Sequence, residues 1–207
     1  MGAVVVTEHP LIRHKLGLVR MKQTEPWLFR QLVNEITYLM LYEATRNLRT
    51  RPIPIETPLA STTAEWLDDD VVVVPILRAG LGMLDGFLRL IPLAKVGFVG
   101  IYRDHESLEP VEYYCKVPEL RKSQVYVLDP MLATGGSAVA AASSLKARGA
   151  TSIRHLCLLA APEGINALHA AHPDVEIYCA HIDERLDEQG YIVPGIGDCG
   201  DRLFWTR

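Results

Sequence analysis

QVYVLDPMLATGGSA, residues 124–138, joins an apolar run to two adjacent glycines and then to small residues. The run 124–128 predicts a buried strand, the glycines predict a tight turn, and the residues from Ser137 onward predict a helix. A Gly-rich turn between a strand and a helix points backbone N–H groups at an anion. Asp129 adds a carboxylate, which repels a bare phosphate. The turn therefore suits a ligand with an anionic group at one end and hydroxyl groups at the other, although a plain turn with a solvated Asp129 would share this pattern.

Similar apolar runs recur along the chain, with helical segments between them. They are nearly continuous in Val, Ile and Leu, as in strands covered on both faces, and they span 71–77, 95–102, 124–128, 152–161 and 175–181. Helices are expected over 82–90, 137–148 and 164–172, and a longer one over 25–47 with Thr24 as its N-cap. Strands that alternate with helices predict an α/β fold with a doubly wound parallel sheet.

Residues 103–123 do not fit this alternation. The segment RDHESLEPVEYYCKVPELRKS is polar, contains prolines and is too irregular for a crossover helix, so we expect a lid-like excursion at the edge of the sheet. No linker or repeat interrupts the 207 residues, which predicts a single domain over 1–207. Ligands of such folds bind outside the carboxyl ends of the strands, so residues that directly follow strands are the first candidates for function.

Two arginines stand at such positions. Arg78 ends the run 71–77 and is followed by Gly80 and Gly82, and Arg103 ends the next strand. Two guanidinium groups at neighbouring strand ends could hold a diphosphate by paired hydrogen bonds. Ion pairing with acidic neighbours at the surface is the alternative for each arginine.

Charge and composition narrow the class of protein. The formal net charge of −4 and the pI near 6.0 argue against a dedicated nucleic-acid binder, which normally has a basic face. The first residues lack the pattern of a signal peptide, and no apolar stretch is long enough to span a membrane, so we expect a cytoplasmic protein. The chain has no GxxxxGK[ST] sequence, which disfavours a nucleoside triphosphatase.

The segment GYIVPGIGDCGDR, residues 190–202, contains the pattern GxGxxG. The dinucleotide-binding fingerprint needs a following helix and an acidic residue about twenty positions later, but only a few residues remain here. A dehydrogenase is therefore excluded by length. The exposed backbone groups of a loop with this composition suit the edge of a small planar heterocycle.

Four segments in this order, PILRAGLGM (75–83), VLDPMLATGGS (127–137), APEGI (161–165) and GYIVPGIGDCGDR, carry a resemblance to a known family. The chain resembles the uracil phosphoribosyltransferases of the type I phosphoribosyltransferase superfamily over nearly its whole length. This resemblance implies a doubly wound sheet with a hood built from the chain ends. It also implies transfer of ribose 5-phosphate from 5-phosphoribosyl 1-pyrophosphate (PRPP) to uracil, giving UMP and pyrophosphate in pyrimidine salvage.

The resemblance assigns roles to individual residues. It implies PRPP binding by Arg78, Arg103, Asp129, Pro130, Met131, Leu132, Ala133, Thr134, Gly135, Gly136, Ser137 and Asp198. It implies uracil binding by Ile192, Gly197, Asp198 and Cys199. Catalytic roles fall on Arg78, Arg103, Asp129 and Asp198. Because Pro130 replaces the second acid of the wider superfamily, a protein-held metal is not expected, and Mg²⁺ would arrive on the pyrophosphate of PRPP. A homodimer or homotetramer and a GTP effector are further implications.

Two rival functions are weighed against this one. An RNA-binding regulator of the same superfamily would need a basic surface, which the acidic net charge disfavours. A purine-specific transferase would be expected to carry an acidic pair in the phosphate loop, and the single Asp129 disfavours it.

Overall fold

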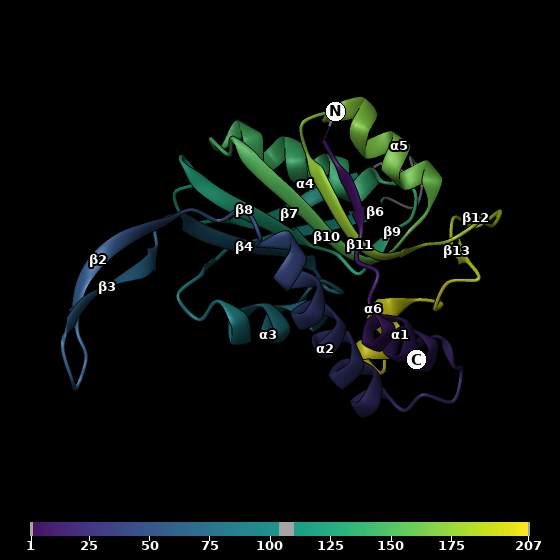
Figure 1. Ribbon diagram of the computed structural model, residues 1–207. Helices are drawn as coiled ribbons and strands as arrows, with labels where there is room; N and C mark the ends of the chain where they lie inside the picture. Colours follow the sequence, from purple (N-terminus) through teal and green to yellow (C-terminus); the bar gives the residue numbers. More distant parts are fainter. Residues whose placement is uncertain (1, 104–109, 207) are drawn as a thin grey trace.

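A nine-stranded sheet forms the centre of the computed structural model, which describes residues 2–103 and 110–206 (Figure 1). The strand order is β1 (Val4–Val6), β11 (Glu176–Ile182), β10 (Ser152–Ala160), β8 (Ser123–Leu128), β4 (Asp70–Leu77), β6 (Phe98–Arg103) and β7 (Pro110–Lys116). The short strands β5 (Lys95–Val96) and β9 (Met131–Leu132) pair with β4 and β10. All of these pairs are parallel except β6 with β7.

Helices cover both faces of this sheet. Figure 1 shows α1 (Pro10–Arg20), α2 (Pro26–Ala44) and α3 (Leu81–Leu90) on one face, and α4 (Gly136–Ala147) and α5 (Pro162–Ala171) on the other. Each face has its own cluster of buried apolar side chains, because the strands are apolar in both directions. The predicted α/β fold with a doubly wound sheet is confirmed.

The order in which the chain adds strands to the sheet reverses between β4 and β8. From β4 the chain moves outward to β6 and β7, and it then returns to β8 on the other side of β4 before it continues to β10 and β11. The carboxyl ends of β4 and β8 lie side by side, with Pro75 paired to Leu128. Such a switch point opens a crevice where ligands bind in this fold class. Arg78 follows one of these strands and Asp129 follows the other.

Two local expectations need correction. Part of the predicted excursion over 103–123 is the regular edge strand β7, while residues 104–109 lie outside the described residues. Thr24 does not cap α2: Glu25 holds the N-cap position, and the Thr24 hydroxyl donates to the Leu18 carbonyl.

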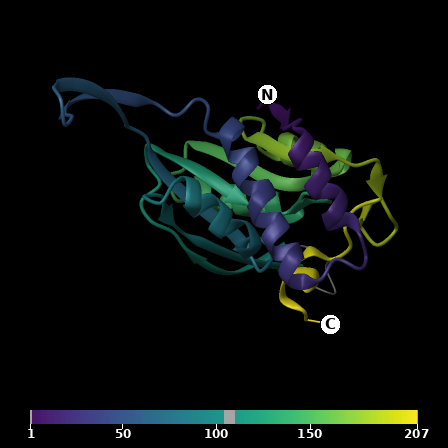
Figure 2. The same cartoon turned by 60° about the horizontal axis from the view of Figure 1, so that its bottom comes forward.

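A hairpin that the sequence did not predict projects from the body of the protein. It consists of β2 (Thr50–Glu56) and β3 (Ser61–Leu67), which pair in antiparallel register from Thr50 with Leu67 to Glu56 with Ser61. Figures 1 and 2 both show this arm extending away from the sheet and its helices. Nearly all of its residues are exposed.

The first two helices and the C-terminal segments of the chain pack against each other. The short helix α6 (Cys199–Phe204) packs against α2, and the hairpin of β12 (Arg185–Leu186) and β13 (Ile192–Val193) precedes it. These C-terminal segments and the two N-terminal helices form the hood that the resemblance implies (Figure 2). Within the described ranges, no helix is long and apolar enough to cross a membrane.

Candidate active site

The turn after β8 has the features of an anion cradle. Gly135 has a φ of +85°, a backbone conformation that favours glycine, and α4 begins directly after it at Gly136. In the part of the chain that the structure describes, the backbone N–H groups of residues 133–137 donate to no protein acceptor. A methyl group added at Gly136 would meet nothing closer than 3.9 Å, so this side of the turn is open. Free donors at a helix N-terminus are suited to phosphate oxygens.

Asp129 lies at the start of this turn, directly after β8. It is half-buried at the carboxyl end of β8, and its carboxylate accepts one long hydrogen bond, 3.5 Å, from the Met131 N–H. Burial raises the pKa of the Asp129 carboxyl to about 7, and the weak Met131 bond opposes this rise. A carboxylate with so few donors around it has free acceptor capacity for the hydroxyl groups of a ligand.

The turn after β4 brings Arg78 to the same crevice. Gly80 lies against the Leu128 carbonyl at the end of β8, so closely that a side chain there would collide with it. The Arg78 side chain is 59% exposed, and its guanidinium lies 3.6 Å from the Asp201 carboxylate of α6, too far for a strong hydrogen bond. Arg78 is therefore available to an anionic ligand. Arg103 ends β6, the neighbouring strand, as predicted.

The loop over residues 192–199, which we call the tail loop, forms the third side of the candidate site. Gly197 and Asp198 are exposed, and Gly197 has a φ of +73°. The Asp198 carboxylate accepts the Asp201 N–H at 2.8 Å and thereby caps α6. Ile192 and Cys199 are buried at 4% and 3% exposure, so their side chains belong to the core. An open hollow of about 710 Å³ runs along this loop and includes Ile192, Gly197 and Asp198 in its wall.

Contacts of glycines and of Asp129 show that the turn after β8, the turn after β4 and the C-terminal segment lie close together. A methyl group added at Gly200 of α6 would lie 3.9 Å from the Ala79 side chain, and one added at Gly82 would lie 2.6 Å from Leu203. The tail helix is thus in contact with the Arg78 turn. Asp129 is also close enough to Cys199 for its charge to add to the burial that raises the pKa of that thiol.

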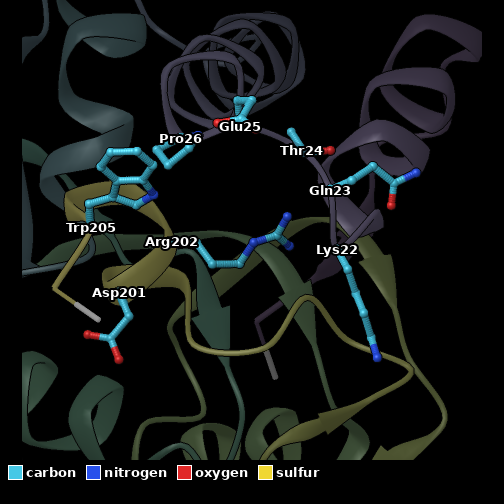
Figure 3. A pocket seen from close by; sticks show the side chains of 8 residues that line it. All are labelled: Lys22, Gln23, Thr24, Glu25, Pro26, Asp201, Arg202 and Trp205. Atoms are coloured by element: carbon cyan, nitrogen blue, oxygen red, sulfur yellow. The ribbon is translucent and has the colours of Figure 1, made fainter.

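Arg202 joins the tail helix to the N-terminal part of the hood, and the sequence did not predict this role. Its guanidinium donates to the carbonyls of Val19 at 2.7 Å, Met21 at 2.6 Å and Ile196 at 3.0 Å. It also lies 4.3 Å from the centroid of the Phe29 ring. Figure 3 shows Arg202 between α6 and the segment that links α1 to α2, next to a hollow of about 350 Å³.

A second buried link fixes the start of the tail loop. Asp183 is almost fully buried, and its carboxylate accepts two hydrogen bonds from Arg20, at 2.6 and 2.9 Å. The same carboxylate accepts the Gly195 N–H at 2.9 Å, and Arg20 also donates to the Gly195 carbonyl. Asp183 directly follows β11, so the strand-end rule applied to every strand would have found it.

No group of three or more His, Cys, Asp and Glu side chains in residues 2–103 and 110–206 is arranged to hold a metal ion. Asp129 offers a single carboxylate with free oxygen, and Asp198 is already used as a helix cap. This donor set fits a magnesium ion that is held mainly by the phosphates of a ligand, since Mg²⁺ is commonly bound by one or two carboxylates together with substrate phosphates.

Residues 6–206 match the family model described as uracil phosphoribosyltransferase. The chain belongs to this family. A uracil phosphoribosyltransferase from Streptococcus thermophilus (strain CNRZ 1066) is 56% identical, with 100% of each chain covered. Another, from Dictyoglomus thermophilum, is 57% identical over 99% of this chain and 100% of the relative. The identification as a uracil phosphoribosyltransferase family member agrees with the resemblance found in the sequence.

Two solved structures have folds similar to that of this chain. The AQ2163 protein from Aquifex aeolicus superposes with a TM-score of 0.94 at 39% identity, and 98% of each chain is covered. A hypoxanthine-guanine phosphoribosyltransferase from Bacillus anthracis superposes with a TM-score of 0.51 at 10% identity, over 76% of this chain and 80% of that one. The second similarity concerns the fold alone, and it shows that a hypoxanthine-guanine phosphoribosyltransferase has a related fold.

Proposed function

We propose that the protein transfers ribose 5-phosphate from PRPP to uracil, giving UMP and pyrophosphate, as the names of its relatives indicate for them. One observation carries the proposal: the free amides of 133–137 lie next to Asp129 at the switch point, where the Arg78 turn and the tail loop also meet. This arrangement offers donors to a phosphate, an acceptor to ribose hydroxyls and a cation to pyrophosphate.

The chemistry needs stabilisation of charge more than a nucleophile. Cleavage of the bond between ribose C1′ and pyrophosphate leaves positive character on the sugar and negative charge on the leaving group. Arg78 and Arg103 stabilise the leaving group, and Asp129 holds the ribose hydroxyls. The turn at 133–137 fixes the 5′-phosphate, so that the uracil nitrogen and C1′ meet in a productive orientation. Mg²⁺ bound with PRPP supplies further positive charge to the pyrophosphate oxygens.

Uracil is recognised by backbone groups of the tail loop. The side chains of Ile192 and Cys199 are buried in the core. These two residues therefore contribute their main-chain N–H and C=O groups, together with those of Gly197 and Asp198. Cytosine presents a donor where uracil presents an acceptor, and an acceptor where uracil presents a donor. A fixed backbone group cannot exchange these roles, so cytosine leaves buried polar groups unpaired and is rejected.

The test is a nucleotide-forming assay with PRPP, Mg²⁺ and each common base. We expect UMP from uracil, a kcat/KM for cytosine lower by about 10⁴-fold, and the same preference in Cys199→Ala. A value for cytosine within tenfold of that for uracil would contradict backbone recognition. A preference for a purine base would overturn the function itself.

Further properties complete the proposal. We propose that the whole chain acts as a single domain in the cytoplasm, that it binds no nucleic acid, and that it assembles as a homodimer or homotetramer. The arm supports assembly, because it exposes the apolar side chains of Leu59 (96%) and Trp66 (53%) far from the core. A GTP effector follows from the resemblance, and addition of GTP to the same assay tests it.

A further inference from the structure

The first turn of α5 lies directly against the back of the phosphate-binding turn. The Ala161 N–H donates to the Leu132 carbonyl at 2.9 Å, immediately before α5 begins. Gly164, in the first turn of that helix, is buried against the same segment. A methyl group at Gly164 would lie 2.6 Å from the Leu132 carbonyl oxygen and closer still to that of Ala133. Both contacts are with backbone atoms, which cannot move aside as a flexible side chain could.

These contacts determine where the amides of the turn point. A trans peptide unit holds its C=O and its N–H on opposite sides. Because the carbonyls of Leu132 and Ala133 face α5, the N–H groups of Ala133 and Thr134 face away from it, toward the open side of the turn. Those N–H groups belong to the set that has no protein acceptor.

A second residue of α5 supports the next peptide of the turn. A methyl group at Gly135 would lie 2.9 Å from both the Ala167 side chain and the Gly164 carbonyl oxygen. Gly135 is the left-handed residue from which α4 starts. The helix α5 therefore contacts the turn at its carbonyls and at its conformational pivot. On the open side, the described atoms within 4 Å of a methyl group added at Gly136 belong to Pro110 and Thr134, and not to α5.

We propose that Gly164, with Ala167, is a positioning residue that aims the amides of 133–137 at the 5′-phosphate of the donor. The proposal rests on the function proposed above and goes beyond it, since it assigns a role to the APEGI segment (161–165), to which the proposed function gives none. A side chain at position 164 pushes the turn toward the ligand, so that the backbone N–H groups of 133–137 no longer point at one phosphate. The pyrophosphate side of the site, built from the Arg78 turn, stays in place.

The experiment compares ribose 5-phosphate with inorganic pyrophosphate plus Mg²⁺ as calorimetric probes of the full-length protein. In Gly164→Ala we expect the Kd for ribose 5-phosphate to rise at least tenfold and the KM for PRPP to rise with it. The Kd for pyrophosphate should stay within twofold of the wild-type value. Gly17→Ala is the matched control, because a methyl group there would meet nothing within 4 Å.

A milder variant keeps the test decisive if Gly164→Ala fails to fold. Ala167→Val enlarges the side chain that faces Gly135 at a half-buried position, and Ala170→Val makes the same change at an exposed position of the same helix. We expect weaker ribose 5-phosphate binding, by about threefold or more, in the first variant only. Unchanged binding in every variant that folds, or an equal loss of both probes, would overturn the positioning role. A wild-type protein that forms no UMP would instead overturn the proposed function.

Discussion

Ionisation of the Asp129 carboxyl destabilises the folded protein near neutral pH. Burial keeps the pKa of its carboxyl near 7 in the folded protein, whereas a carboxyl in an unfolded chain titrates near 4. The folded state therefore favours the protonated acid, and it loses stability as the pH rises from about 4 through about 7. A ligand with hydroxyl donors would relieve this penalty by bonding to the ionised group.

We expect Asp129→Asn to separate stability from activity. At pH 8 the variant should gain about 1–3 kcal/mol of unfolding free energy, because one unit of pKa shift corresponds to about 1.4 kcal/mol and solvent screens part of it. Its kcat/KM for PRPP should fall about 100-fold or more. Urea denaturation at pH 5 and pH 8 measures the first effect. A stability difference that is equal at the two pH values would rule out titration of Asp129 as its cause.

At the scale of single elements, the sequence analysis predicted most parts that have an apolar pattern, but it missed α1, in which Ile12, Leu16 and Val19 recur at helical spacing. The central strands and the helices α2 to α5 were found because Val, Ile and Leu recur in them with the period of a strand or a helix. The arm was missed because Pro52 and Pro54 interrupt β2, and because a hairpin exposed on both faces has no alternation of apolar and polar residues. Prolines are tolerated there, since both strands of an isolated pair are edge strands.

The candidate site was predicted to a similar extent. Arg78 and Asp129 were predicted as candidates because they follow strands, and the structure places each directly after a strand. The strand order that brings these two strand ends side by side was not predicted. The contacts of Arg202 with Val19 and Met21 could not be found in this way, because they join residues at opposite ends of the chain. The helix α6 is too short for a periodic pattern, and its only sequence signal is the capping residue Asp198.

The hairpin of β12 and β13 and the loop after it depend on Asp183. Replacing it with Asn should remove the ion pair with Arg20 and destabilise the protein by about 2–4 kcal/mol, because the partly buried Arg20 guanidinium loses its partner. The KM for uracil should rise more than the KM for PRPP, since the loop that carries Gly197 is released first. Glu188→Gln, a change of the same type at an exposed residue, serves as the control. Equal changes in the two KM values would show that the anchor does not act on the base side.

At the scale of the whole molecule, the arm can be separated from the fold. The Asp68 N–H donates to the Arg49 carbonyl at 2.9 Å, so the chain closes on itself at the base of the hairpin. Replacing residues 50–67 with a short Gly-Ser linker should therefore leave the sheet intact. We expect this variant to sediment as a smaller species than the wild-type protein and to keep a similar circular dichroism spectrum. Identical sedimentation coefficients, after correction for mass, would exclude the arm from assembly.

The unpaired amides of the turn at 133–137 have a consequence for solvent exchange. With no protein acceptor, these N–H groups bond to water in the free protein and should exchange their hydrogens for deuterium rapidly. Bound PRPP would replace that water with phosphate oxygens and slow the exchange at the same five positions. The Ala161 N–H, which donates to the Leu132 carbonyl, gives an internal reference that should exchange slowly with or without ligand. Peptide-resolved deuterium uptake would thus read occupancy of the donor site directly, and in an inactive variant it would distinguish a turn that cannot bind from one that binds without reacting.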